Sequence, residues 1–159
     1  MDNEHHIETD AIRIQAERGP YREHAVPIYA TSSFVFDSVE AGADAFEGAS
    51  DQPIYSRFDN PNTDEFSRKL ARLEGMDAGF ATASGMSAVF MSMMALLQRG
   101  DHVVGSPSVF SSTLKLLNDF LPRWGIETTL APLTDPEAWR AAVRTNTRMF
   151  VLETPSNPG

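Results

Sequence analysis

An amphipathic helix is predicted between residues 60 and 75. Phe66, Leu70 and Leu73 fall at positions i, i+4 and i+7 of this stretch, which places them on one face of a helix. The Asn-Pro pair at its start supplies a capping residue and a first helical residue. Gly75 stands where a helix commonly ends.

Beyond this helix, short apolar stretches alternate with helical ones. The predicted strands are 78–83, 102–104, 126–130 and 149–152, and the predicted helices are 86–98, one that starts at Ser111 or Ser112 and one that Asp135 and Pro136 open. Apolar strands that alternate with helices indicate an α/β fold with a parallel sheet covered by helices. Ligands bind such sheets at the carboxyl ends of the strands, so the loops to consider are 82–86, 105–112 and 153–159.

The first 59 residues lack this regularity. Glycines and prolines interrupt them, the apolar stretch 26–36 has no clean alternation, and a short helix is expected over 38–46 with Ser38 as its cap. We therefore expect an N-terminal arm over residues 1–59, followed by the α/β part over residues 60–159.

Composition narrows the classes of function. The chain has 159 residues, of which 42% are hydrophobic and 22% charged, as in one ordinary globular domain. Its formal net charge of -9 argues against binding nucleic acid or an anionic membrane. It has no cysteine, no metal-ligand spacing among its four histidines, no membrane-length apolar stretch and an acidic start. We therefore expect a soluble cytoplasmic protein.

The loop around Ser84, Gly85 and Met86 is a candidate anion site. A strand that ends in small residues, followed by Ser-Gly and then a helix, places free backbone N–H groups and the positive end of a helix dipole at one point. This arrangement suits a phosphate dianion. A plain capped turn between a strand and a helix is the alternative.

Tyr55 and Arg57 form a second candidate. In an extended segment, residues i and i+2 point the same way, so the phenol and the guanidinium can converge on one phosphate. The alternative is a tyrosine packed on the core and an arginine paired with Asp59 or Asp64.

Two further candidates follow predicted strands. Phe110 lies where an aromatic ring could cover a planar ligand, although most phenylalanines pack in the core. Asn157 precedes Pro158, which keeps it out of helical angles and holds its side chain at the edge of the sheet. Taken by itself, that segment is a turn.

In this order, four segments resemble the Cys/Met metabolism family of enzymes that depend on pyridoxal phosphate. They are Tyr29-Ala-Thr-Ser-Ser-Phe34, Tyr55-Ser-Arg57 with Asn60-Pro61, Ala83-Ser-Gly-Met-Ser-Ala88, and Glu153-Thr-Pro-Ser-Asn-Pro158. The likeness runs from about Ile12 to the end of the chain. The segment Ser108–Thr113 is most similar to the sulfhydrylase branch.

The resemblance implies a fold-type I, aspartate-aminotransferase-like enzyme and a set of contacts to pyridoxal 5'-phosphate. The N–H groups of Gly85 and Met86 would hold the phosphate, and Ser84 would be a further cofactor-binding residue. Phe110 would stack on the pyridine ring, Asn157 would bond the ring hydroxyl, and Glu153 would brace the pocket.

The resemblance also implies partners and a reaction. Tyr55 and Arg57 would reach the phosphate across the subunit interface of a homo-oligomer, expected to be a homotetramer. The implied reaction is γ-replacement in methionine biosynthesis. Sulfide or a thiol takes the place of the acyloxy group of O-succinylhomoserine or O-acetylhomoserine, which gives homocysteine when the donor is sulfide, and the cofactor serves as the electron sink.

The lysines set a limit on this interpretation. The chain has two, Lys69 and Lys115, and neither stands in the Ser-x-Thr-Lys setting of the family's Schiff-base lysine. No catalytic residue is therefore predicted within the chain. We expect residues 60–159 to be the front part of a longer enzyme's large domain, inactive without the remainder.

Three other interpretations stay open. The chain could come from a cystathionine γ-synthase or a γ-lyase. It could be a non-catalytic homologue that pairs with a full-length subunit, or a plain α/β binding domain.

The sequence also departs from the family at Asn62, where the family usually has Thr, so the helix start is expected to be capped differently. Pro107 and Ser111 replace the usual Arg and Gly of the sulfhydrylase branch, which weakens the substrate assignment.

Overall fold

The computed structural model describes residues 6–13 and 18–158. The chain forms two units, residues 1–81 and 82–159. Among the described residues, no helix has the length and apolar character that a membrane crossing requires.

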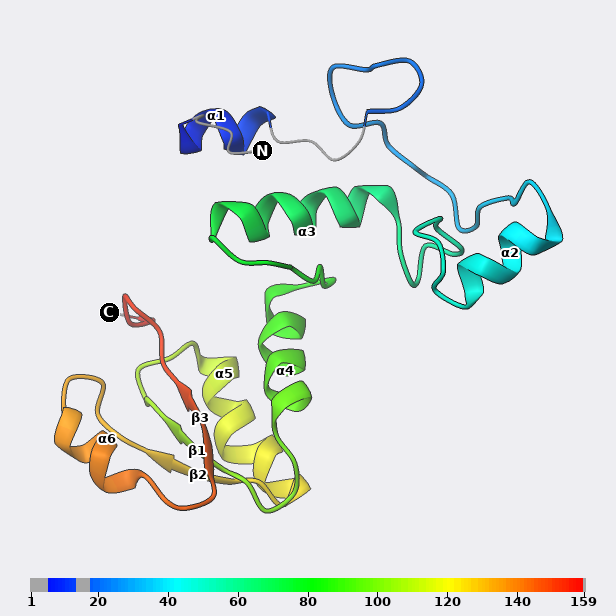
Figure 1. The fold of residues 1–159 in the computed structure, drawn as a ribbon. Coiled ribbons are helices and arrows are strands. Elements are labelled where there is room, and N and C mark those ends of the chain that lie inside the picture. The colour runs from blue at the N-terminus through cyan, green and yellow to red at the C-terminus, as the bar shows by residue number, and fades with distance from the viewer. Residues whose placement is uncertain (1–5, 14–17, 159) are drawn as a thin grey trace. The chain divides into compact units, whose positions relative to one another are not determined.

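The first unit holds three helices, α1 (Ile7–Arg13), α2 (Val39–Phe46) and α3 (Pro61–Leu73) (Figure 1). The predicted helices over 38–46 and 60–75 are thereby confirmed. Ser38 caps α2, since its hydroxyl accepts a hydrogen bond from the N–H of Ala41 at 3.1 Å. α1 was not predicted, and the Asp10–Arg72 ion pair at 3.5 Å connects it to α3.

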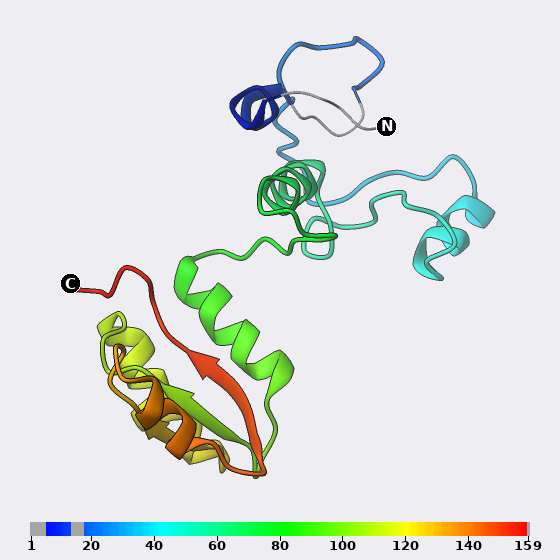
Figure 2. The same ribbon diagram turned by 60° about the vertical axis from the view of Figure 1, so that its left-hand side comes forward.

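The second unit is an α/β layer structure. Its elements are α4 (Gly85–Leu96), β1 (His102–Gly105), α5 (Ser111–Lys115), a π-helical turn (Leu116–Phe120), a 3₁₀ turn (Leu121–Trp124), β2 (Glu127–Leu130), α6 (Pro136–Ala142) and β3 (Thr147–Val151). The three strands form a parallel sheet in the order β2-β1-β3. The predicted parallel sheet is confirmed, with helices packed against it (Figures 1 and 2).

The strand predicted over residues 78–83 is wrong. This segment pairs with no strand among the described residues. A side chain on Gly79 would come within 2.7 Å of the Ser67 carbonyl oxygen, so the segment lies closely against α3. An apolar extended segment becomes a strand only when a neighbour supplies the ladder of hydrogen bonds.

The core of the second unit lies between the sheet and the helical segment 111–124. Leu117, Leu121 and Ile126 are almost fully buried against Val103 of β1. Met93 of α4 joins the same cluster. The helix predicted to start at Ser111 or Ser112 is confirmed, although its backbone changes from α to π to 3₁₀.

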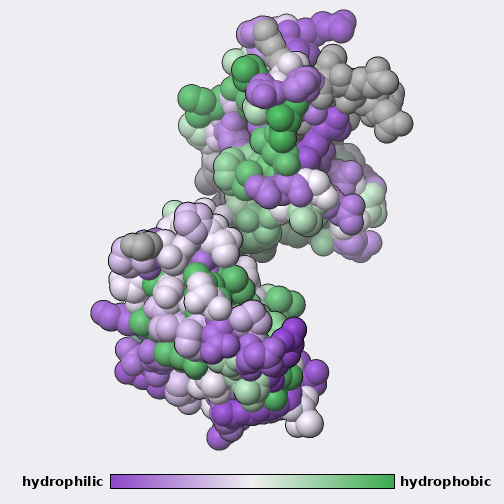
Figure 3. All heavy atoms as spheres, turned by 90° about the vertical axis from the view of Figure 1, so that its left-hand side faces the viewer, coloured by the Kyte–Doolittle hydropathy of each residue, from purple (hydrophilic) through white to green (hydrophobic). Residues whose placement is uncertain are grey.

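Apolar side chains also remain on the surface of the second unit. Phe150 of β3 is 53% exposed and Leu152, just after it, is 47% exposed. On the face of this unit that is visible in Figure 3, apolar side chains lie among polar ones. The described residues therefore leave part of the apolar surface uncovered.

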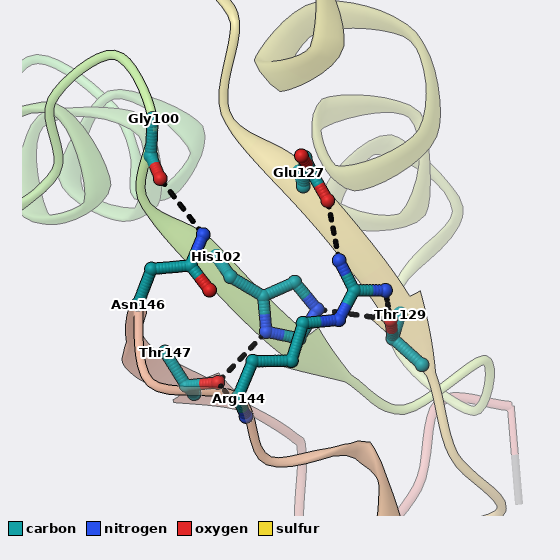
Figure 4. Close-up of polar contacts among 7 residues, drawn as sticks. All are labelled: Gly100, His102, Glu127, Thr129, Arg144, Asn146 and Thr147. Atoms are coloured by element: carbon teal, nitrogen blue, oxygen red, sulfur yellow. Dashed lines mark hydrogen bonds and ion pairs between the residues drawn. The ribbon is translucent and has the colours of Figure 1, made fainter.

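A polar cluster around the buried His102 lies at the amino ends of the strands (Figure 4). His102 is fully buried, with its Nδ1 2.8 Å from the Thr147 hydroxyl and its Nε2 2.9 Å from the Thr129 hydroxyl. The Arg144 guanidinium donates to the Thr129 hydroxyl at 3.0 Å and pairs with Glu127. Burial, and then the charge of Arg144, lower the pKa of His102. A neutral imidazole suits two hydroxyl partners because it has one donor and one acceptor nitrogen.

The lowered pKa of His102 predicts a pH dependence of stability. The stabilisation from its neutral form is fully present above the unfolded pKa of about 6.5 and is lost as pH falls through the folded pKa. Within that window we expect the free energy of unfolding to fall by up to about 1.4 kcal/mol per pH unit through this residue. Urea unfolding at about pH 7.5 and about pH 5.5 measures the change.

The control compares His102→Gln with the parent chain, which keeps every other titratable group. His102→Gln should flatten the dependence. An equal pH dependence in His102→Gln and the parent chain would contradict the assignment.

Gly105 tests the packing of the sheet against the core. An added Cβ would lie 2.6 Å from Leu117 Cδ1, and Leu117 is fully buried. We expect Gly105→Ala to lower the free energy of unfolding by about 1–3 kcal/mol, because the core has no space for the methyl group. Gly85→Ala is the matched control, since its Cβ would meet nothing within 4 Å. Urea unfolding of both variants checks the difference, and equal stabilities would refute the packing argument.

Candidate functional site

The N-terminus of α4 presents backbone donors to solvent. Ser84 is the capping residue, with φ -161° and ψ 159°, and its hydroxyl accepts from the N–H of Ser87 at 3.1 Å. The cap therefore uses the amide of Ser87 and does not occupy those of Gly85 and Met86, which lie in the turn where helical amides have no carbonyl within the helix to bond. Ser84 and Gly85 are exposed, and a Cβ on Gly85 would meet nothing within 4 Å.

The fold brings this helix end to the expected edge of the sheet. α4 runs antiparallel to β1 and β3, so its N-terminus lies at the end of the second unit where these strands finish (Figures 1 and 2). The amino ends of the strands, with the His102 cluster, lie at the opposite edge. The predicted position of the site at the carboxyl edge agrees with this arrangement.

Phe110 stands in the loop after β1, where it is the residue before α5. Its ring is 43% exposed and is not part of the core. Its N–H donates to Glu153 Oε1 at 2.9 Å. Since Glu153 follows β3, its carboxylate connects the loops that leave two neighbouring strands and fixes the backbone that carries the exposed ring.

Asn157 lies in the loop that follows β3. Its N–H donates to the Ser108 carbonyl at 3.4 Å, and the residue is exposed. Ser106 fixes the position of Ser108, because its hydroxyl accepts from the N–H of Ser108 at 3.0 Å. The N–H of Ser106 in turn donates to the carbonyl of Val151, the last residue of β3, at 2.8 Å. Asn157 and Phe110 are therefore carried by two loops that are joined at both Ser108 and Glu153.

Tyr55 and Arg57 come together in the first unit. The N–H of Phe58 donates to the Tyr55 carbonyl at 2.8 Å, which makes the segment a turn rather than the extended backbone that we predicted. The guanidinium carbon of Arg57 lies 4.6 Å from the Phe58 ring centre and 5.4 Å from that of Tyr55. Asp64, one of the alternative ion-pair partners, pairs with Arg68 at 2.8 Å instead.

The seven predicted site residues thus fall into two groups. Tyr55 and Arg57 belong to the first unit, and the second unit carries the remaining five, Ser84, Gly85, Met86, Phe110 and Asn157. The second group offers backbone amides at a helix N-terminus, which suit a phosphate, and an exposed aromatic ring and an asparagine on two joined loops, which suit a pyridine ring. These residues therefore fit the cofactor.

The two lysines lie elsewhere. Lys69 is on α3 and pairs with Glu65 at 3.8 Å, and Lys115 is the last residue of α5. Neither lies in the loops that carry Phe110 and Asn157. The part of the chain that the structure describes also has no group of three His, Cys, Asp or Glu side chains placed to hold a metal ion.

A set of polar side chains around the Tyr55–Arg57 turn was not among the predicted site residues. Ser56, Asn60 and Asn62 hydrogen-bond the backbone of residues 27–31. The signal was the accumulation of three short polar side chains within seven residues, of which Asn60 was interpreted as a helix cap alone.

Comparison with known proteins agrees with the predicted resemblance. Residues 8–159 match the family described as "Cys/Met metabolism PLP-dependent enzyme". An O-succinylhomoserine sulfhydrylase of Pseudomonas aeruginosa is 42% identical over 152 residues, which are 96% of this chain and 38% of that protein. An L-methionine gamma-lyase of Porphyromonas gingivalis is 42% identical over 134 residues, 84% of this chain and 34% of that protein. The chain thus spans little more than a third of these relatives.

Solved structures give the same result for the fold. A putative O-acetylhomoserine (thiol)-lyase of Campylobacter jejuni, solved with N'-pyridoxyl-lysine-5'-monophosphate, matches 95% of this chain with a TM-score of 0.88 and 30% identity. The metB protein of Corynebacterium glutamicum matches 98% of the chain with a TM-score of 0.87 and 28% identity. This chain covers 37% and 39% of those two chains.

The predicted fold-type I architecture is therefore confirmed over the matched part of these enzymes. The family model covers nearly the whole chain, and the observed loops carry the motifs on which the resemblance was based. This chain belongs to the Cys/Met metabolism family of pyridoxal-phosphate-dependent enzymes.

Proposed function

We propose that this chain supplies the phosphate and ring contacts of an O-succinylhomoserine or O-acetylhomoserine sulfhydrylase. The observation that carries the proposal is the exposed N-terminus of α4. The Ser84 hydroxyl caps the amide of Ser87, so the amides of Gly85 and Met86 can donate to an acceptor outside the helix. A phosphate dianion bound there gains both hydrogen bonds and the field of the helix dipole.

The loops after β1 and β3 would bind the pyridine ring. Phe110 would cover one face of the ring, and Asn157 would donate to the ring hydroxyl. Glu153 would keep Phe110 in place through the 2.9 Å bond to its N–H. When bound, the cofactor supplies an electron sink for the carbanion chemistry of γ-replacement. The protein residues supply orientation and charge complementarity.

Tyr55 and Arg57 would complete the phosphate site from a second subunit of a homo-oligomer. The Arg57 guanidinium can donate two hydrogen bonds to a phosphate, and the Tyr55 hydroxyl can donate one more. The exposed apolar residues of the first unit support association with a second copy, among them Ile28 at 89% and Val35 at 90% exposed.

The Schiff-base lysine would come from outside these 159 residues. Lys69 is engaged by Glu65 on α3, and Lys115 ends α5. The curated relatives extend well beyond the region matched here, with 38% of the Pseudomonas aeruginosa enzyme covered. Binding of the cofactor by this chain and catalysis by the complete site are therefore separate properties.

Gly85→Pro tests the phosphate site by removing one N–H donor. Proline suits the first helical position, and Ser84 already has the extended angles that a following proline requires. We expect the affinity for pyridoxal phosphate to fall by about 10-fold or more, as for loss of a hydrogen bond to a charged group. The affinity for pyridoxal, which lacks the phosphate, should hardly change. Isothermal titration with both ligands measures this.

Gly85→Ala is the matched control, because it adds a methyl group in open space and keeps the N–H. It should bind both ligands like the parent chain. Equal loss of pyridoxal and pyridoxal phosphate in Gly85→Pro would argue that the helix start was disturbed or that the phosphate binds elsewhere.

Chimeras test the sulfhydrylase assignment against the γ-lyase alternative. This chain would replace the matching part of the Pseudomonas aeruginosa sulfhydrylase and, separately, of the Porphyromonas gingivalis γ-lyase, each compared with its own parent. We expect the first chimera to keep a larger fraction of its parent's rate, since the segment Ser108–Thr113 as a whole is most similar to the sulfhydrylase branch. Homocysteine formation from O-succinylhomoserine and sulfide, and methionine cleavage, are the two assays. A larger retained fraction in the γ-lyase chimera would contradict the assignment.

A further inference from the structure

Residues 27–34 of the first unit run alongside residues 54–62 and are bonded to them along their length. Ser33 and Tyr55 form an antiparallel bridge. On one side of the bridge the N–H of Phe34 donates to Ile54 at 3.3 Å, and on the other the N–H of Ser56 donates to Ser32 at 2.9 Å. The backbone of Tyr55 is therefore held between two hydrogen bonds to the N-terminal segment.

Side chains continue this pairing beyond the backbone bridge. The Ser56 hydroxyl donates to the Thr31 carbonyl at 2.5 Å. Asn60, which is 8% exposed, donates from Nδ2 to the Tyr29 carbonyl at 3.1 Å and to the Ser56 hydroxyl at 3.0 Å. Its Oδ1 accepts from the N–H of Asn62 at 2.9 Å. One asparagine thus caps α3 and holds the segment 27–34 at the same time.

Asn62 makes the outermost contacts. Its Oδ1 accepts from the N–H of Tyr29 at 2.8 Å, and its Nδ2 donates to the Pro27 carbonyl at 2.7 Å. The carboxamide therefore bonds the backbone as a neighbouring strand would, with one donor and one acceptor. A threonine has a single hydroxyl on a shorter side chain and cannot bond both groups in this way.

The segment 27–34 matters because the turn that carries Tyr55 and Arg57 has few other supports. Inside the turn, the N–H groups of Phe58 and Asp59 both donate to the Tyr55 carbonyl, at 2.8 and 3.1 Å. Tyr55 is 39% exposed and Phe58 67% exposed, and Arg57 is exposed as well. Since packing contributes little here, hydrogen bonds to the segment 27–34 fix the turn.

We propose that Asn62 is a positioning residue for Tyr55 and Arg57. By anchoring Pro27 and Tyr29, its carboxamide keeps the segment 27–34 against the turn, and the turn then presents its phenol and guanidinium in a fixed arrangement to a phosphate. The inference rests on the proposed function, because it takes Tyr55 and Arg57 as phosphate ligands. The cap of α3 is Asn60, whose side chain accepts from the N–H of Asn62. The side chain of Asn62 therefore has a role other than capping the helix.

Asn62→Thr and Asn62→Asp test the inference in the full chain. Threonine removes both contacts, and aspartate keeps the acceptor for Tyr29 but loses the donor to Pro27. We expect faster hydrogen exchange at the amides of Tyr29 and Ser56 in Asn62→Thr, and an intermediate effect at Tyr29 in Asn62→Asp. The preference for pyridoxal phosphate over pyridoxal should fall by about 5-fold in Asn62→Thr, as for the net loss of one hydrogen bond.

Two further variants separate the possible outcomes. Asn118→Thr changes an exposed asparagine of the second unit and should leave exchange and ligand preference unchanged. Arg57→Gln should lower the phosphate preference at least as much as Asn62→Thr, without faster exchange at Tyr29. If Arg57→Gln lowers the preference and Asn62→Thr leaves it unchanged, the positioning role is wrong. If Arg57→Gln has no effect, the proposed phosphate contact itself fails, and the inference fails with it.

Discussion

The pairing of β1 on both of its edges determines the geometry of the second unit. β1 hydrogen-bonds in parallel with β2 and β3, and its residues are fully buried between helices. Parallel neighbours finish at the same edge of a sheet, so the loops after β1 and β3 meet there. Phe110, Asn157 and the Glu153 contact between the loops all follow from this constraint. The His102 cluster satisfies the polar groups at the opposite edge.

The electrostatic character of the site depends on one helix end. The chain is acidic, with a formal net charge of -9, so an anion cannot rely on the field of the whole molecule. Backbone amides at the N-terminus of α4 provide a local positive field that the net charge does not remove. Tyr55 and Arg57 would add a side-chain contribution from another subunit. With this division, an acidic protein would be able to offer a phosphate site.

Local signals predicted most of the helices, and features that depend on distant partners were missed. Pro61 and Ser38 marked helix starts because caps act within one turn. The segment 78–83 has the composition of a strand but pairs with none, and composition does not reveal a partner. The π-helical turn at 116–120 and the contacts of Asn62 to Pro27 and Tyr29 arise from tertiary packing. For the site, the assignment of Phe110 and Asn157 to the cofactor stays a prediction that rests on the order of the motifs, whereas the shape of the Tyr55–Arg57 turn required the structure.

The central claim is that the amides at the start of α4 bind the cofactor phosphate. The most direct measurement is a titration of the ¹⁵N-labelled chain with pyridoxal phosphate, pyridoxal and inorganic phosphate, followed by the amide signals of Gly85 and Met86. The account predicts large shifts of these two signals with pyridoxal phosphate, smaller shifts in the same direction with phosphate, and none with pyridoxal. Unchanged signals at Gly85 and Met86 while other amides respond to pyridoxal phosphate would contradict it.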